Sequence, residues 1–415
     1  MYDNGAILAL FVFGYSVIAG CVERSWISGP IVFTAAGVVL GPNVLGLLRL
    51  DLDAKDLRVL AEATLAMVLF TDAANADLRV LRSTVTLPQR LLLIGLPLTI
   101  LFGFAVAWLF FPSLGILELA LLATMLAPTD AALGKPVVVN PAVPPNIRES
   151  LNVESGLNDG ICVPLIVVLL GLATGTQIEH SAPVHVLLVV VEELGIGIAV
   201  GAVLAAAGAE LLRRAAALGW ISDTWNMVSA PALAGASFAA AQSIGGSGFV
   251  ACFVSGLLLG ALLPQHKNAR LGGAEGLGEA LALMTWLVFG SIVVGQLLNN
   301  ANPAVILYAI LSLTVIRMLP VALCLIGARM AVAESLFVGW FGPRGLASIV
   351  FAIMVIDAKL PGNTTLIATV LWTVVLSVIL HGLTANSFAH LLAKRSTSGM
   401  DIGTRTTRRD RSNAH

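Results

Sequence analysis

The stretch Glu154-Ser155-Gly156-Leu157-Asn158-Asp159 lies inside an apolar segment that is long enough to cross a lipid bilayer. About two dozen residues upstream, Pro128-Thr129-Asp130 interrupts a second apolar segment. A charged side chain at the centre of a bilayer costs roughly 2.5–3.5 kcal/mol on insertion scales, so acidic residues at this depth need a reason. The usual reason is a pathway for ions or protons. These two stretches therefore predict a membrane protein with a polar site in its interior.

The composition predicts that the bilayer surrounds most of the chain. Hydrophobic residues make up 58% of the 415 residues, charged residues make up 11%, and the mean hydropathy is +0.93. A water-soluble domain could not bury so much apolar surface. Apolar stretches of the length that a hydrocarbon core of ~30 Å requires recur along the whole chain. We count thirteen of them, at residues 5–22, 28–48, 58–76, 90–112, 115–134, 150–174, 184–212, 223–243, 246–264, 279–298, 303–327, 333–356 and 364–393.

The basic residues indicate how the chain is oriented. The loops after the odd-numbered segments, together with the end of the chain, carry seventeen lysines and arginines, whereas the loops on the opposite side carry four. Loops rich in lysine and arginine remain in the cytoplasm. We therefore expect a multi-pass protein of the plasma (inner) membrane with its N-terminus outside and its C-terminus in the cytoplasm. Residues 1–393 form the predicted membrane domain. Residues 394–415 form a basic tail that is expected to be disordered, because it is polar and has no hydrophobic periodicity.

Two of the predicted spans contain residues that interrupt a helix. The fifth contains Pro128, and the twelfth contains Gly342-Pro343-Arg344-Gly345. Such breaks must be buried in protein or line a cavity, because lipid cannot pair with the freed backbone groups. When segments 2–6 and 9–13 are taken as two sets of opposite direction, each break falls in the fourth member. Interrupted helices in inverted repeats mark the midplane site of many transporters. The expected fold is an all-α polytopic membrane protein with thirteen transmembrane helices, inverted five-helix repeats, and two broken helices that cross near the midplane.

The polar residues of the fifth and sixth segments predict an oxygen-rich site. On a helix, Ser155 and Asp159 share one face, and Glu154 and Asn158 form a neighbouring stripe. Asp130 on the broken fifth segment is expected to meet Asp159. Carboxylates, a hydroxyl and free carbonyls suit an alkali cation and are a poor fit for zinc or copper. Burial and a nearby negative charge favour protonation of a carboxylate, so a proton is expected to compete with the cation. The alternative is a neutral, hydrogen-bonded cluster that only joins helices.

Arg317 and Arg344 are the two basic residues inside predicted spans, and each needs an acidic or carbonyl partner. Glu154 is the predicted partner of Arg344, in an ion pair that orients the site. Asp72, near the cytoplasmic end of the third segment, lines a funnel for cations or is a solvated residue at a helix end. Asp72 and Arg317 are thus candidates for the cation path. His381 lies at a span end and is expected at the surface rather than as a pH sensor.

Three motifs resemble those of the monovalent cation:proton antiporters, in the branch that includes the NhaP and NHE proteins. The resemblance covers essentially the whole chain. The broken-helix motif of that family resembles Ala127-Pro128-Thr129-Asp130. Its Asn-Asp motif resembles Glu154-Ser155-Gly156-Leu157-Asn158-Asp159-Gly160. Its arginine motif resembles Phe341-Gly342-Pro343-Arg344-Gly345.

The resemblance implies a role for each residue of the site. Asp159 binds the cation and the proton in turn, and Na⁺ is held at Asp130, Ser155 and Asp159, with the backbone carbonyl of Thr129 completing the coordination. Glu154, Asn158 and Arg344 form a supporting polar cluster. Asn158-Asp159, in place of two aspartates, resembles the electroneutral branch, which exchanges one proton for one cation.

The resemblance also implies how the helices divide. Family members are homodimers in which a six-helix core moves against a dimerisation domain. Residues 58–174 and 279–393 are then expected to contain the core, with the dimerisation helices between them. Glu192 and Glu193 lie in the seventh segment, and at least one of them is expected to face another helix or a dimer partner.

The predicted function is secondary antiport of Na⁺ (or Li⁺) against H⁺ by alternating access, in a role in pH homeostasis. The predicted partners are small inorganic cations, the lipid bilayer and a second copy of the chain, with no cofactor and no nucleic acid. The nearest alternative is the same machinery with K⁺ as the cation. A cation channel is less favoured, since the sequence has no repeated selectivity filter. An intramembrane enzyme is not expected, since no metal motif or Ser/His pairing occurs at span depth.

Overall fold

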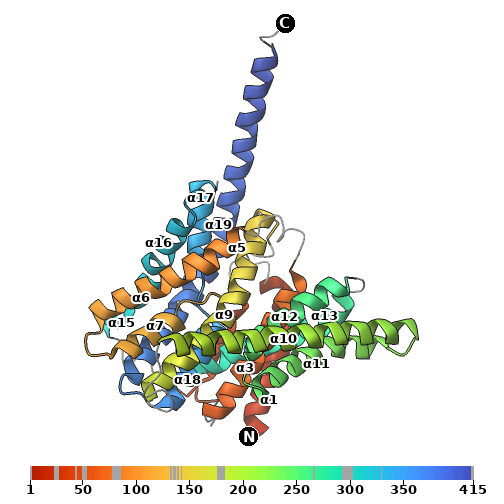
Figure 1. The fold of residues 1–415 in the computed structure, drawn as a ribbon, viewed down its shortest axis with the longest axis vertical. Coiled ribbons are helices and arrows are strands. Elements are labelled where there is room, and N and C mark those ends of the chain that lie inside the picture. Colours follow the sequence, from red (N-terminus) through yellow and green to blue (C-terminus); the bar gives the residue numbers. More distant parts are fainter. Residues whose placement is uncertain are drawn as a thin grey trace.

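The computed structural model describes residues 2–22, 28–42, 44–48, 54–76, 86–130, 133, 137, 140–141, 143–174, 183–264, 267–291, 302–328 and 330–412. Every regular element of at least five residues in these ranges is helical, which confirms the all-α class (Figure 1). The elements are α1 (Tyr2–Val22), α2 (Gly29–Leu40), α3 (Ala54–Asn75), α5 (Thr86–Arg90), the π-helix η1 (Leu91–Gly95), α6 (Leu96–Phe110), α7 (Ile116–Met125), α9 (Pro145–Thr174), α10 (Pro183–Ala217), α11 (Asp223–Ser243), α12 (Gly248–Leu262), α13 (Lys267–Phe289), α15 (Pro303–Leu313), α16 (Val315–Cys324), α17 (Val332–Trp340), α18 (Leu346–Ala358) and α19 (Asn363–Ser412).

Each of the thirteen predicted segments overlaps at least one of these helices. Within the described ranges, six helical stretches are long and apolar enough to cross a membrane: Asp3–Val22, Thr86–Phe110, Pro145–Thr174, Val191–Ala217, Pro303–Cys324 and Asn363–Ala385. Shorter apolar helices occupy several of the other segments. The chain is therefore a polytopic membrane protein, while the number of thirteen crossings and the inverted repeats stay predictions.

Both helix breaks occur where the sequence predicts them. α7 ends at Met125, and the chain from Leu126 to Asp130 is not helical. α17 ends at Trp340, and residues 341–345 form the break before α18 begins at Leu346. The backbone N–H of Asp130 donates to the carbonyl oxygen of Pro343 at 2.8 Å. The two breaks are therefore in direct contact. Most residues of the fifth segment beyond Asp130 lie outside the described part of the chain.

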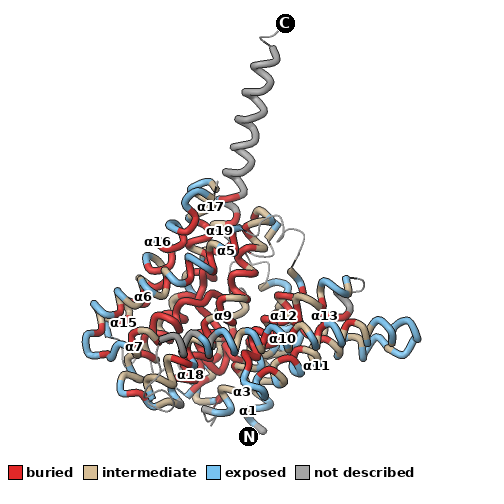
Figure 2. Tube along the Cα trace, viewed as in Figure 1, coloured by how far each residue is buried: buried red, intermediate tan, exposed pale blue. Residues whose placement is uncertain are grey.

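Buried residues concentrate in the middle of the bundle, around α9 and α12 (Figure 2). α3 and α12 pack there with close backbone contact: a Cβ atom at Gly256 would collide with the carbonyl oxygen of Phe70. Small residues at such positions let membrane helices approach closely. The outer helices instead expose large apolar side chains, for example Leu10 and Phe13 on α1, at 70% and 69%. This distribution fits a protein whose outer surface contacts lipid.

α19 continues well beyond the body of the molecule and carries the C-terminal end of the chain (Figure 1). The sequence predicts a disordered tail from residue 394, whereas the backbone is helical as far as Ser412. The physical reason is that a helix already nucleated in the bundle gains one hydrogen bond for each residue added, without a new nucleation cost. Residues 394–412 contain no proline to stop it. The division into a membrane domain and a tail stays a prediction.

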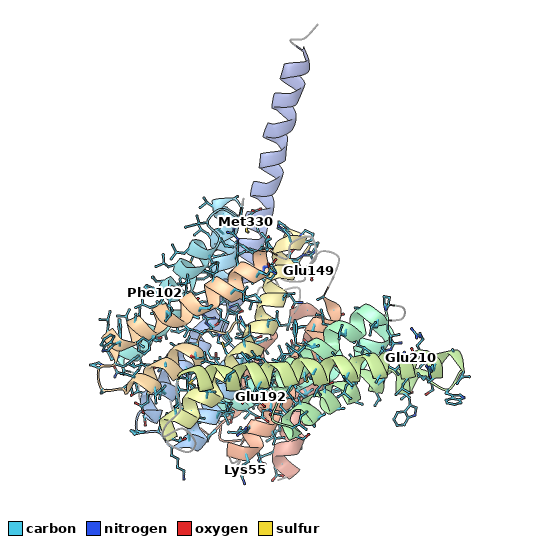
Figure 3. All side chains as sticks on the ribbon, in the orientation of Figure 1. Lys55, Phe102, Glu149, Glu192, Glu210 and Met330 are labelled. Atoms are coloured by element: carbon cyan, nitrogen blue, oxygen red, sulfur yellow. The ribbon has the colours of Figure 1, made fainter. Side chains whose placement is uncertain are left out.

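α10 is the other long element, and it runs across the front of the bundle in the view of Figure 3. Glu192 lies on its exposed surface, and Glu210 lies toward the end that extends beyond the neighbouring helices (Figure 3). The backbone carbonyl of Glu193 accepts the N–H of Ser247 at 3.0 Å, which ties α10 to the start of α12.

Candidate functional site

The break after α7 is held by two side chains of α9. The hydroxyl of Ser155 donates to the backbone carbonyl of Thr129 at 2.6 Å. The side-chain amide of Asn158 donates to the hydroxyl of Thr129 at 2.9 Å. All three residues are buried. The structure therefore brings Thr129, Ser155 and Asn158 together at the point where α7 stops, because one helical face of α9 presents residues three and four positions apart.

Asp130 links the two breaks. Its Oδ2 accepts the backbone N–H of Leu346, the first residue of α18, at 2.8 Å, and its Oδ1 accepts the N–H of Leu133 at 3.3 Å. A carboxylate at a helix N-terminus satisfies an unpaired N–H and interacts favourably with the helix dipole. Gly345 makes this approach possible, since a Cβ atom there would collide with Oδ2. Asp130 thus serves as the N-terminal cap of α18 while contributing a negative charge to the site.

Asp159 is the acidic side chain of the site whose hydrogen bonding is incomplete. It is 3% exposed and lies one helical turn beyond Ser155 on α9. Its Oδ1 is buried and has no hydrogen-bond partner among the described residues. Asp72, Asp130 and Arg344 are close enough for their charges to act on it. A buried carboxylate oxygen without a partner is unfavourable unless a proton or a cation satisfies it.

The two buried arginines have different partners from those predicted. Arg317 on α16 forms an ion pair with Glu154, with Nη1–Oε1 at 2.6 Å and Nη2–Oε2 at 2.9 Å. Arg344 donates from Nη1 to the carbonyl oxygens of Ala127 and Pro128, at 2.6 and 2.8 Å. The predicted pairing of Glu154 with Arg344 is therefore wrong.

The helix geometry explains this arrangement. The carbonyls that follow the last turn of α7 have no helical partners and lie at the negative end of its dipole. They are thus suitable acceptors for Arg344. Glu154 instead forms a bidentate pair with the guanidinium of Arg317. The general requirement, an acidic or carbonyl partner for each arginine, holds for both residues.

Asp72 lies on α3 and is half-buried. Its backbone carbonyl accepts the side-chain amide of Asn152 on α9 at 3.3 Å, so α3 is fixed against the helix that carries Asp159. The roles of Asp72 and Arg317 in a cation path stay predictions.

Sequence reasoning missed a set of polar residues on α19. The Ser377 hydroxyl accepts the backbone N–H of Arg344 at 2.7 Å, and the ring of His381 contacts both Ser377 and the carbonyl of Trp340. His381 is 1% exposed, so its predicted surface position is wrong. The expectation that no serine pairs with a histidine at span depth is also wrong, because the Ser377 hydroxyl lies 3.2 Å from Nδ1 of His381. The available signal was the spacing: Ser377 and His381 are four residues apart in a largely apolar span, and so share one face.

Comparison with known proteins places this geometry in a family. The family model described as "Sodium/hydrogen exchanger, transmembrane" matches residues 7–390. The chain belongs to this family. The family that the three motifs predicted is thereby confirmed, and the chain is a membrane antiporter of monovalent cations rather than an enzyme.

Relatives of this chain differ in the cation that their names give. The K(+)/H(+) antiporter NhaP2 of Shewanella sp. (strain MR-4) is 26% identical over 400 residues, covering 94% of this chain and 68% of that protein. The Na(+)/H(+) antiporter of Schizosaccharomyces pombe is 27% identical over 356 residues, covering 76% and 75%. The solved structure of the sodium proton antiporter MjNhaP1 from Methanocaldococcus jannaschii at pH 8 matches the fold with a TM-score of 0.76. It has 22% identity and covers 94% of this chain and 98% of that one.

Proposed function

We infer that this exchanger transports Na⁺ (or Li⁺) against H⁺ across the plasma membrane by alternating access, with Asp159 as the group that binds cation and proton in turn. The observation that carries the inference is the buried Oδ1 of Asp159, which has no partner among the described residues. The preceding residue, Asn158, is bonded to Thr129 in the break after α7. A proton neutralises this carboxylate, and so does a bound cation. Each ion therefore removes the need for the other.

Oxygens of the break after α7 and of α9 would complete the cation site with Asp159. The Thr129 carbonyl accepts one hydrogen bond, from Ser155, and keeps a second lone pair. The Ser155 hydroxyl donates its proton to that carbonyl, and a hydroxyl oxygen is a ligand that alkali cations accept. Asp130 adds a charge from the opposite break. Together these groups form the hard, all-oxygen environment that alkali cations prefer.

The different bonding of the two aspartates supports an exchange of one proton for one cation. Both carboxylate oxygens of Asp130 accept backbone N–H groups, from Leu346 and Leu133, so this residue is stabilised as an anion. Asp159 has one buried carboxylate oxygen, Oδ1, with no hydrogen-bond partner among the described residues. Its neighbour on α9 is the neutral Asn158, which is occupied with Thr129. One carboxylate is then available to lose a proton when a cation binds, which makes the exchange electroneutral.

K⁺ is the second candidate cation. The similar Shewanella protein is named a K(+)/H(+) antiporter, and an oxygen site of this kind suits either ion. Exchange of Na⁺ and exchange of K⁺ would use the same residues and would differ in the ionic radius that the site prefers.

A homodimer with its N-terminus outside and C-terminus in the cytoplasm, acting in pH homeostasis, completes the proposal. Glu192 is exposed on the apolar helix α10, and a carboxylate that faces lipid is costly. A second copy packed against α10 would cover it. The core of each protomer, within residues 58–174 and 279–393, would then move against the dimerisation helices.

The test is cation-driven dissipation of a pH gradient in proteoliposomes that contain the full chain. Na⁺, Li⁺ and K⁺ are compared for wild type and Asp159→Asn, with and without a K⁺/valinomycin voltage clamp. We expect saturable Na⁺-dependent exchange that is lost in Asp159→Asn and unchanged by the clamp. Exchange with K⁺ alone would favour the second candidate, non-saturable conductance would indicate a channel, and transport by Asp159→Asn would contradict the role of Asp159.

A further inference from the structure

The break between α17 and α18 is fixed from a third side by α19. The Nε2 atom of His381 lies 2.9 Å from the carbonyl oxygen of Trp340, the last residue of α17. The Nδ1 atom lies 3.2 Å from the Ser377 hydroxyl, and this hydroxyl accepts the backbone N–H of Arg344 at 2.7 Å. Ser377, His381 and Arg344 are each at most 1% exposed. One helix face of α19 therefore holds both ends of the five-residue break.

The hydrogen bonds indicate which ring atom carries the proton. A carbonyl oxygen only accepts, so Nε2 donates to Trp340. Nδ1 can then accept the proton of the Ser377 hydroxyl, whose lone pairs remain available for the N–H of Arg344. The neutral ring is therefore compatible with all three hydrogen bonds, from Nε2 to Trp340, from Ser377 to Nδ1 and from Arg344 to Ser377. A doubly protonated ring would instead donate from Nδ1 to the carbonyl of Ser377, 3.1 Å away, and would release the hydroxyl.

The neighbouring charges fit the neutral ring. The charged groups that act on His381 are two arginines, Arg344 at the start of α18 and Arg317 on α16. The ring also packs beside the indole of Trp340, with centroids 5.4 Å apart, and that indole donates to Thr384 on α19 at 3.0 Å. The contacts of His381 are therefore those of a fixed hydrogen-bonding group.

The contacts lead from α19 to the oxygens of the cation site. Ser377 holds the backbone of Arg344, whose guanidinium holds the carbonyls of Ala127 and Pro128. The next residue is Thr129, whose carbonyl faces Ser155. If the end of α17 or the backbone of Arg344 shifts, the Thr129 carbonyl shifts with it.

We propose that His381 is a positioning residue for cation binding, which acts with Ser377 to fix the α17–α18 break and thereby the Thr129 carbonyl. The proposal rests on the proposed function, since it concerns the same site. It adds a helix and two residues that the site motifs do not include. The cation affinity of the exchanger is then set in part by a neutral histidine on α19.

The test compares the apparent KM for the cation with the maximal exchange rate in proteoliposomes. The variants are His381→Ala, Ser377→Ala and the conservative His381→Gln, whose side-chain amide can still donate to Trp340. The matched control is Thr373→Val, on the same helix and equally buried, whose hydroxyl donates to Thr369 within α19. The loss of one buried hydrogen bond corresponds to about a three- to tenfold change in an equilibrium constant.

We expect His381→Ala and Ser377→Ala to raise the apparent KM about three- to tenfold, with His381→Gln and Thr373→Val close to wild type. The pH profile of His381→Gln should match that of wild type. An unchanged KM in Ser377→Ala and His381→Ala would overturn the proposal, as would a displaced pH optimum in His381→Gln, which would indicate a titrating group. If His381→Ala does not fold, the apparent KM of Ser377→Ala alone tests the proposal. A wild type without any exchange would instead refute the proposed function itself.

Discussion

Replacement of Arg317 by methionine should strongly destabilise the protein, because it would leave the carboxylate of Glu154 buried without its counter-ion. The two side chains are each 1% exposed and are joined by two short contacts, at 2.6 and 2.9 Å. Removing one partner from such a pair costs about 3–5 kcal/mol. We expect a large loss of apparent melting temperature in detergent for Arg317→Met.

A double-mutant cycle distinguishes the Glu154–Arg317 pair from the Glu154–Arg344 pair that the sequence predicted. Glu154→Gln combined with Arg317→Met should cost less than the sum of the two single changes, with a coupling energy of about 2–3 kcal/mol. The same cycle with Arg344→Met in place of Arg317→Met should give a much smaller coupling, because Arg344 donates to backbone carbonyls. The assay is equilibrium unfolding in mixed micelles of a mild detergent and SDS. A coupling to Arg344 that exceeds the coupling to Arg317 would refute the assignment of the ion pair.

Three further predictions concern the breaks. Arg344→Ala should lower both thermal stability and exchange, since it strands two buried carbonyls at a cost of about 1–3 kcal/mol each; normal stability with lost transport would indicate a direct role in transport. Gly345→Ala should abolish exchange and lower the melting temperature, because its Cβ would displace the Asp130 carboxylate, whereas Gly276→Ala, with open space around it, should behave as wild type in both assays. Ser155→Ala should raise the apparent KM for the cation about three- to tenfold and keep measurable exchange, since one hydrogen-bonding oxygen is lost; an unaltered KM would remove the hydroxyl from the site.

The sequence predicts features that depend on a single helix. The positions of both breaks follow from proline and glycine in apolar spans. The sequence places Ser155 and Asn158 on neighbouring stripes of α9, and only the structure shows that both contact Thr129. The all-α class follows from the length and number of apolar stretches.

The features that sequence reasoning missed depend on packing between helices. Arg317 and Arg344 are both basic residues in apolar spans, and spacing along the chain does not indicate which one meets Glu154. The choice is made by the position of Arg317 on α16 opposite Glu154 on α9, and by the buried carbonyls after α7 that have no helical partners. His381 near the end of an apolar stretch resembles a surface residue until α17 is packed against it.

The number of protons released when a cation binds tests most directly whether Asp159 binds cation and proton in turn. Purified full-length protein in a weakly buffered detergent solution is mixed with NaCl, with choline chloride as the control, and a pH-sensitive dye records the release at several pH values. Exchange of the two ions at one carboxylate predicts about one proton released for each Na⁺ bound in wild type, and no release in Asp159→Asn. Binding of Na⁺ without proton release, or release that persists in Asp159→Asn, would contradict it.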